Sequence, residues 1–183
     1  GIIHFHDSDY FAQHMHNCDL VNLEDMLMNG TVISETRIEK PHSFSTACNI
    51  ATQIIAQVAS NQYGGQSVDM RHLGKYLRKS SNKFHRQIRE EFGDSLDNEA
   101  VEKMARIRLR DELKSGVQTI QYQINTLMTT NGQAPFVTLF LRLDDEDEYI
   151  DENALIVEEI LRQRLEGIKN EAGVYVTPAF PKL

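Results

Sequence analysis

Four of the seven histidines in this sequence form two closely spaced pairs near its start. His4 and His6 alternate along a strand-like run, and His14 and His16 repeat that spacing further on. Because alternate residues of a strand point to the same face, each pair could present two imidazoles to one metal ion. With the carboxylates of the DSD cluster at 7–9, such a set is found in metal-dependent hydrolases. We prefer hydrogen bonding or packing for these histidines, and keep a metal-dependent hydrolase as the alternative.

The two cysteines, Cys18 and Cys48, have different neighbours. Cys48 belongs to the apolar face of an expected helix, where a cysteine is usually a small buried hydrophobe. Cys18 lies between an asparagine and an aspartate at the end of an expected short strand, where active sites of α/β proteins gather. Cys18 is therefore the better thiol for chemistry. A cysteine protease would need a base, which His16 or His6 could supply, but no oxyanion motif follows.

Two long segments must position these residues, and neither contains a charged side chain although 25% of the chain is charged. They span 42–67 and 115–141. Apolar residues recur in them at three- and four-residue steps, which predicts helices, while the other positions carry amides and hydroxyls. Solvated helices normally carry outer charges, so we expect both helices to be covered on all sides. Either their amides satisfy one another within the fold, or they form an oligomer interface or a nucleotide site.

The order of the expected elements indicates an α/β protein with parallel strands joined by helical crossovers. Strands are expected at 1–6, 16–21, 31–34, 136–141 and 174–180, and helices at 23–28, 42–60, 69–93, 99–128 and 154–169. The paired glycines Gly64 and Gly65 should end the first long helix and leave backbone N–H groups exposed. The basic helix 69–93 should have a solvated charged face, with contacts to a triphosphate as the alternative for some of its cations.

Composition narrows the class of protein further. With 183 residues the chain can form one domain or part of a larger one, and its net charge of −8 argues against general nucleic-acid binding. Helix N-termini and glycine turns could still bind a phosphorylated small molecule. The apolar runs are too short and too rich in amides for a membrane span. Two cysteines without a secretory leader predict a reducing, cytoplasmic setting. Both ends lie at strand-like runs, as if the chain were part of a longer one.

Several long strings resemble a known enzyme family, the anaerobic (class III) ribonucleoside-triphosphate reductases. In chain order they are HFHDSDYF, HNCDLVNLEDMLMNG, QIIAQVASNQYGGQS, QTIQYQINTLMTTNGQAPFVT and FPKL. The resemblance covers nearly the whole chain, and 71–113 is its least diagnostic part. It implies that residues 1–183 are a single fragment of a catalytic ten-stranded α/β barrel, roughly its first half, without an ATP-cone or a glycyl-radical domain.

The resemblance also implies radical chemistry on ribonucleoside triphosphates. A glycyl radical, generated by a radical-SAM activating protein, would create a thiyl radical on a cysteine outside this chain, which removes the 3′ hydrogen of the ribose. Cys18 matches the second cysteine, which donates hydrogen as the 2′ hydroxyl leaves as water. Formate or a thioredoxin-like protein would supply the electrons. Asn17, His4 and His6 would line the substrate pocket, and no metal or other cofactor is expected within this segment.

Finally, the family resemblance implies a homodimer built through helices, with dNTP or ATP effectors bound near the interface. Asn49, Gln53 and Gln57 are the candidates for this interface and effector site, since amides can pair with base edges. The chain lacks the thiyl cysteine, a zinc-binding cysteine cluster and the glycyl-radical loop, so we expect it to be inactive alone. The remaining alternative is a non-catalytic dNTP-binding dimerisation module. Nucleic acid and membrane are not expected as partners.

Overall fold

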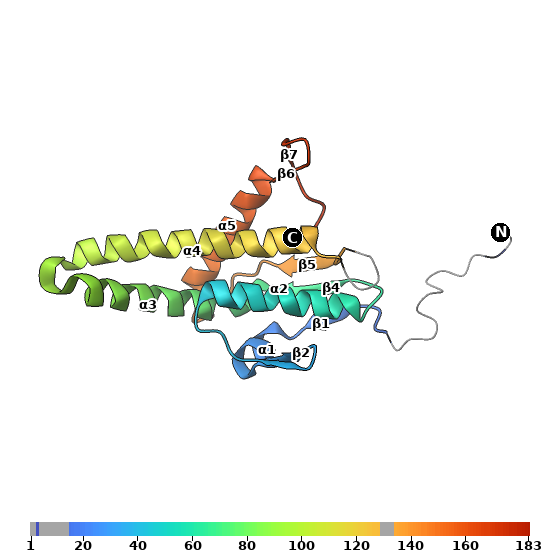
Figure 1. The fold of residues 1–183 in the computed structure, drawn as a ribbon, viewed down its shortest axis with the longest axis horizontal. Coiled ribbons are helices and arrows are strands. Elements are labelled where there is room, and N and C mark those ends of the chain that lie inside the picture. The colour runs from blue at the N-terminus through green and yellow to red at the C-terminus, as the bar shows by residue number, and fades with distance from the viewer. Residues whose placement is uncertain (1–2, 4–14, 129–133) are drawn as a thin grey trace.

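The computed structural model describes residue 3, residues 15–128 and residues 134–183. Within these ranges the chain forms a small parallel sheet, four long helices and two short antiparallel hairpins (Figure 1). No helix in the described ranges is long and apolar enough to cross a membrane. The strand expected at 1–6 lies outside the described residues.

The sheet contains β1 (Asp19–Val21), β4 (Gln66–Asp69) and β5 (Val137–Phe140), side by side in the order β1-β4-β5. Both strand pairs are parallel. Near the end of the chain, Lys182 adds a further parallel bridge beside Thr138, at the outer edge of β5. Helices lie between successive strands in the sequence, as parallel pairing requires. The expectation of a helix-rich α/β protein with parallel strands is confirmed.

The main core lies between one face of the sheet and two helices, α2 (Phe44–Ser60) and α4 (Asn98–Thr126). Val68 and Leu139 of the sheet belong to the same buried cluster as Ile54 of α2 and Ile124 of α4. Burying such aliphatic side chains removes apolar surface from water, which is the main term that holds the layers together. Ile156 and Ile160 of α5 (Ile150–Glu166) belong to the same buried cluster.

The opposite face of the sheet is open within the described residues. Leu20 of β1 is 75% exposed and Phe136, just before β5, is 44% exposed, although Val68, Val137 and Leu139 of the same sheet are at most 2% exposed. Side chains of a strand alternate between faces, so Leu20, Ser67 and Thr138, which the register aligns, share this open face.

A helical hairpin extends beyond the sheet as an arm (Figure 1). It consists of α3 (Gly74–Phe92), the turn η3 (Gly93–Ser95) and the first half of α4. Its own small core contains Ile88, Val101 and Ala105. Arg108 and Glu91 tie the two helices together at 2.8 Å.

The remaining elements are short. They are α1 (Leu23–Asn29), the hairpin of β2 (Thr31–Ile33) and β3 (Thr36–Ile38), the 3-10 helix η2 (Met70–Leu73), and the hairpin of β6 (Ile168–Lys169) and β7 (Tyr175–Val176). Asn22 caps α1 by accepting a hydrogen bond from the Asp25 N–H at 3.3 Å.

The structure corrects three of the expected elements. Residues 66–69 form the central strand β4, although the sequence indicated a turn followed by a helix. Residues 36–38 form β3, which was not expected. The strand expected at 174–180 is wrong, because only Tyr175–Val176 pairs, and it pairs in a separate hairpin with β6. Whether the parallel strands are half of a ten-stranded barrel stays a prediction.

Candidate functional site

Cys18 lies just before β1, so it is at the amino end of the sheet. The sequence placed it at the end of a strand, and this detail is wrong because pairing resumes only at Asp19. The thiol is exposed, free of any disulfide, and its sulfur lies 3.6 Å from the Asn17 side-chain oxygen, to which it donates a weak hydrogen bond. Asn17 and Cys18 are neighbours in the sequence, so this contact is local, and their role as site residues stays a prediction.

The backbone on either side of Cys18 is anchored to the segment that precedes β4. The His16 N–H donates to the Asn61 carbonyl at 3.2 Å, and the Asp19 N–H donates to the Gly65 carbonyl at 3.1 Å. Between these two anchors the chain is free to present the Cys18 side chain at the open face of the sheet.

The paired glycines make this close approach possible. A Cβ on Gly64 would lie 2.0 Å from the Asn17 carbonyl oxygen, and one on Gly65 would lie 2.6 Å from a carbon of the Phe136 ring. Extending the strand register by one residue places Cys18 beside Gly65 and Gly65 beside Phe136. The glycines thus allow Asn17 and Phe136 to pack closely beside Cys18. The prediction that they end α2 is wrong, because this helix ends at Ser60 and its C-cap residue is Asn61.

An aromatic and basic group completes this face, and sequence reasoning missed it. The Phe136 and Phe180 rings are tilted against each other with centroids 4.7 Å apart. The Lys182 ammonium lies 4.7 Å from the Phe136 centroid and 6.0 Å from that of Phe180. The only signal in the sequence was that these residues fall in the strings APFVT and FPKL.

Cys48 is fully buried between α2 and α4, as expected for a structural cysteine. Burial, and to a smaller extent the negative charge of Glu112, raises the pKa of the Cys48 thiol well above its ordinary value. The neutral thiol is therefore favoured at this position, which suits packing and opposes reactivity.

The predicted metal set cannot be assembled from the described part of the chain. His4, His6 and His14 lie outside the described residues, while His16 is exposed and lies 3.6 Å from an Asp19 carboxylate oxygen. No group of three or more metal-binding side chains occurs among the described residues. Beside His16 a cavity of about 280 Å³ opens between β1 and the end of α2, and Gln57 contributes to its wall.

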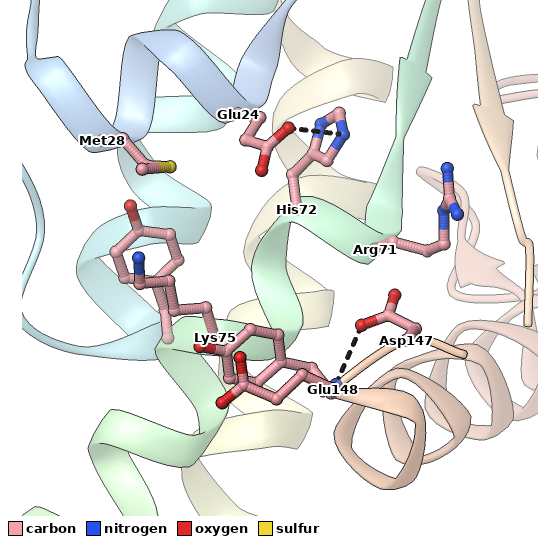
Figure 2. A pocket seen from close by; sticks show the side chains of 9 residues that line it. Glu24, Met28, Arg71, His72, Lys75, Asp147 and Glu148 are labelled. Atoms are coloured by element: carbon pink, nitrogen blue, oxygen red, sulfur yellow. Dashed lines mark hydrogen bonds and ion pairs between the residues drawn. The ribbon is translucent and has the colours of Figure 1, made fainter. Parts of the chain in front are cut away.

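A second cavity, of about 390 Å³, lies at the carboxyl edge of the sheet (Figure 2). Its walls come from segments that follow each of the three strands, and they carry both acids and bases: Glu24, Met28, Arg71, His72, Lys75, Tyr76, Asp147, Glu148 and Tyr149. Sequence reasoning did not assemble this cavity, because its charged residues come from distant segments.

Most charges of this second cavity are already compensated. Arg71 donates to the Asp69 carboxylate at 2.8 Å, and these hydrogen bonds lower the pKa of Asp69 although its partial burial opposes them. His72 lies 4.0 Å from Glu24. The arrangement therefore fits an ion-pair network that fixes the carboxyl edge of the sheet, rather than a cation site or an anion site.

Asn49, Gln53 and Gln57 form an exposed stripe along α2, on the side away from the core. Within the described part of a single chain these amides are uncovered, and their cover by a second copy or a ligand stays a prediction. No hydrogen bond joins an amide of α2 to an amide of α4 in the described residues, which contradicts mutual satisfaction of their amides. The helices pack instead through aliphatic side chains, and the amides face outward.

Comparison with known proteins agrees with the family resemblance. The family model for anaerobic ribonucleoside-triphosphate reductase matches residues 1–183. The chain is 40% identical over 187 residues to the anaerobic ribonucleoside-triphosphate reductase of Escherichia coli (strain K12). It is 37% identical over 186 residues to that of Haemophilus influenzae and 36% identical over 189 residues to that of enterobacteria phage T4.

These alignments include 100% of this chain but only 24%, 25% and 29% of the respective relatives. The chain thus spans about a quarter of the length of the curated relatives it matches. Since the family model matches every residue, the chain belongs to the family of anaerobic ribonucleoside-triphosphate reductases.

Proposed function

We propose that this chain forms part of the catalytic domain of an enzyme that reduces ribonucleoside triphosphates to 2′-deoxyribonucleoside triphosphates. Its own contribution to the reaction is the Cys18 thiol. The observation that carries this proposal is a free, exposed thiol on an open sheet face, in a chain that matches the reductase family from end to end.

The chemistry suits a thiol in this place. The S–H bond of Cys18 is weak enough to give a hydrogen atom to a ribose radical at C2′, while the 2′ hydroxyl leaves as water. The radical site in the substrate comes from a thiyl radical outside this chain, formed through the glycyl radical of the whole enzyme. The sulfur of Cys18 can then share the oxidised state with that second sulfur, until formate or a thioredoxin-like protein restores both.

Asn17 is the side chain placed to assist Cys18. Its oxygen accepts from the thiol at 3.6 Å, so it can hold the S–H in one orientation and bind a hydroxyl of the sugar once the hydrogen has moved. His4 and His6 are proposed to line the same pocket. Their positions lie outside the described residues, so this assignment stays a prediction.

The test is a pair of cysteine variants in the full-length reductase. Cys18→Ser replaces a transferable hydrogen with a strong O–H bond, so deoxyribonucleotide formation should fall by at least about a thousandfold. Cys48→Ser serves as the matched control and should retain turnover of the folded enzyme. Full activity of Cys18→Ser would rule out this role. The 183-residue chain alone should be inactive with or without formate.

A second function is supported by the outer face of α2. We infer that Asn49, Gln53 and Gln57 contribute to a homodimer interface and to binding of dNTP or ATP effectors. Near the start of this helix, Lys79 has a lowered pKa because it is partly buried and because Lys75 and Lys40 lie close to it. None of the three lysines forms an ion pair within the described residues, so together they favour an anionic ligand such as a triphosphate.

Effector binding can be measured without catalysis. A nucleotide that binds the folded protein raises its melting temperature, so dTTP, dGTP, dATP and ATP should each be tested on the full-length protein by thermal shift. A shift that disappears in Gln53→Ala and in Lys79→Met, but persists in Cys18→Ser, would support this site. Equal shifts in all variants would place the effector elsewhere.

Two further expectations remain proposals. The free thiols Cys18 and Cys48 agree with a reducing, cytoplasmic setting. A radical-SAM activating protein is the expected partner of the whole enzyme. The metal-dependent hydrolase is the alternative. Metal analysis of the purified protein distinguishes it, because stoichiometric metal lost in His4→Ala and His14→Ala would favour the hydrolase.

A further inference from the structure

Lys182 is fixed to the sheet although it lies outside the three main strands. Its N–H donates to the Val137 carbonyl at 2.8 Å, and its carbonyl accepts from the Leu139 N–H at 2.8 Å. The parallel bridge to Thr138 puts both side chains on the same face. This is the open face, where Phe136 is exposed and where Cys18 precedes β1.

Two side chains of the long helices hold the segment that carries Lys182. Arg164 of α5 donates to the carbonyl oxygen of Pro178 at 2.6 Å and also to that of Pro181. Asn125 of α4 donates to the Phe180 carbonyl at 2.9 Å. The backbone around Lys182 is thus anchored from two helices, which limits the positions that its flexible side chain can reach.

The ammonium of Lys182 has aromatic neighbours but no acidic one. It lies over the Phe136 ring at 4.7 Å, and no carboxylate among the described residues lies within ion-pair distance. The contact with an aromatic ring orients a cation without neutralising it. A lysine held this way keeps its positive charge available to an anionic ligand.

The distance between the strands indicates which kind of anion Lys182 could bind. Cys18, Gly65 and Phe136 lie on successive neighbouring strands, so the thiol and the aromatic group are about 10 Å apart at the ordinary strand spacing. A small anion that must react at the sulfur, such as formate, could not do so from Lys182. A nucleotide is long enough to place its sugar at Cys18 and its phosphates at the ammonium, passing the Phe136 ring that packs against Gly65.

We propose that Lys182 is a substrate-binding residue that contacts the phosphate groups of the ribonucleotide whose ribose lies at Cys18. This inference rests on the proposed reductase function and adds the direction in which the substrate lies across the sheet. Phe136 and Phe180 act as positioning residues, because they orient the ammonium without contacting the phosphate themselves.

The test uses the full-length enzyme and a matched pair of lysines. Lys182→Met should raise the KM for CTP by roughly 10- to 100-fold, as expected for loss of a charge-assisted contact, with kcat changed less than about threefold. Lys182→Arg should keep most of the affinity. Lys169→Met is the control, because Lys169 also lies over an aromatic ring, that of Tyr175 at 5.2 Å, but in the β6–β7 hairpin.

Binding without turnover separates the possible outcomes. In a Cys18→Ser background, equilibrium dialysis should show that Lys182→Met weakens binding of CTP roughly 10- to 100-fold and leaves binding of cytidine unchanged. Equal weakening of both ligands, or an unchanged KM with a lowered kcat, would overturn the phosphate contact. If Lys182→Met lowers the melting temperature, Lys182→Gln is measured in the same way. Failure of the wild-type enzyme to reduce CTP would contradict the reductase function itself, which is a separate result.

Discussion

The two thiols of this chain differ in environment, and this difference determines which one can react. Cys18 is exposed and has a polar neighbour in Asn17, whereas Cys48 is fully buried beside Gly116 of α4. Thiol reactions need both access and a thiolate, and burial deprives Cys48 of both by raising its pKa.

This contrast predicts how a thiol reagent labels the 183-residue chain, which has two cysteines. With a small aromatic disulfide reagent at pH 8, one equivalent of thiol should react within seconds to minutes, and the second only after unfolding in denaturant. Cys18→Ser should remove the fast phase, and Cys48→Ala should leave it unchanged. A fast phase that persists in Cys18→Ser would show that the interior around Cys48 opens readily.

The exposure of Cys18 and the burial of Cys48 could be predicted from their immediate neighbours, because one lies among polar residues and the other on an apolar helix face. The place of Lys182 could not be predicted this way. Its position depends on pairing with Thr138 and on hydrogen bonds from Arg164 and Asn125, which come from three different elements. Contacts between distant segments leave no local pattern in a sequence.

At the scale of the elements, Gly116 of α4 allows this helix to pack closely against α2. A Cβ on Gly116 would lie 2.6 Å from a carbon of the Phe44 ring and 3.0 Å from the Cys48 sulfur. Glycine normally weakens a helix by about 1 kcal/mol relative to alanine, so its place in the middle of α4 is explained by packing.

Gly116→Ala should therefore destabilise the fold even though it favours the helix. Overpacking costs about 1–3 kcal/mol and helix propensity returns about 1 kcal/mol, so we expect a net loss of up to about 2 kcal/mol in the free energy of unfolding. Urea unfolding of the 183-residue chain, followed by circular dichroism, measures this. Ser115→Ala on the exposed side should change stability by less than about 0.5 kcal/mol. Phe44→Leu should rescue Gly116→Ala if the ring is the obstacle.

The arm contains a contact that depends on pH. The His85 ring nitrogens lie 2.7 Å from a Glu102 carboxylate oxygen and 2.8 Å from the Ser81 carbonyl oxygen, and these hydrogen bonds raise the pKa of His85 above its ordinary value of 6.5. The stabilisation of the fold by this His85 contact is therefore fully present below about pH 6.5. It is lost as the pH rises through the raised pKa of His85. The hydrogen bond from His85 also lowers the pKa of Glu102. The stabilisation that comes from the ionised Glu102 carboxylate is therefore lost only in acid, as the pH falls through this lowered pKa.

We accordingly expect wild type to melt above His85→Gln at pH 6, and the difference to shrink at pH 8.5. Both side chains are partly exposed, so solvent screening keeps the effect small and 0.5 M salt should reduce it further. Arg86→Gln removes an exposed pair with Glu90 on the same helix and should show no such pH dependence. A difference that grows from pH 6 to pH 8.5 would contradict the assignment.

Element types were predictable where the hydrophobic period was long. The helices at 44–60, 74–92, 98–126 and 150–166 were all expected within a few residues, since each repeats its apolar face several times. The central strand β4 was not predictable in this way. Gln66–Asp69 contains a single aliphatic residue, and two of its three buried residues are polar. Gln66 is stabilised there by donating to the Ile55 carbonyl at 2.9 Å, a contact that only the tertiary structure provides.

In the molecule as a whole, the helix layer and the open face of the sheet carry different kinds of side chain. The helices bury their aliphatic faces against the sheet, so the neutral amides of α2 point away from it, and the thiol and Lys182 lie on the far face of the sheet. In the proposed enzyme one side would therefore serve assembly and effector binding, and the other would serve chemistry.

A stripe of neutral amides fits an interface between copies, because uncharged polar groups can be buried if they find partners, whereas a charge cannot be buried alone without a large cost. We predict that the full-length protein is a homodimer and that Gln53→Lys with Gln57→Lys raises its dissociation constant by at least about 30-fold, which corresponds to about 2 kcal/mol. Analytical ultracentrifugation measures this directly. Asn82→Lys adds a charge to the exposed side of α3 and should leave the dimer intact. A dimer that tolerates both lysines on α2 would show that its interface lies elsewhere on the surface.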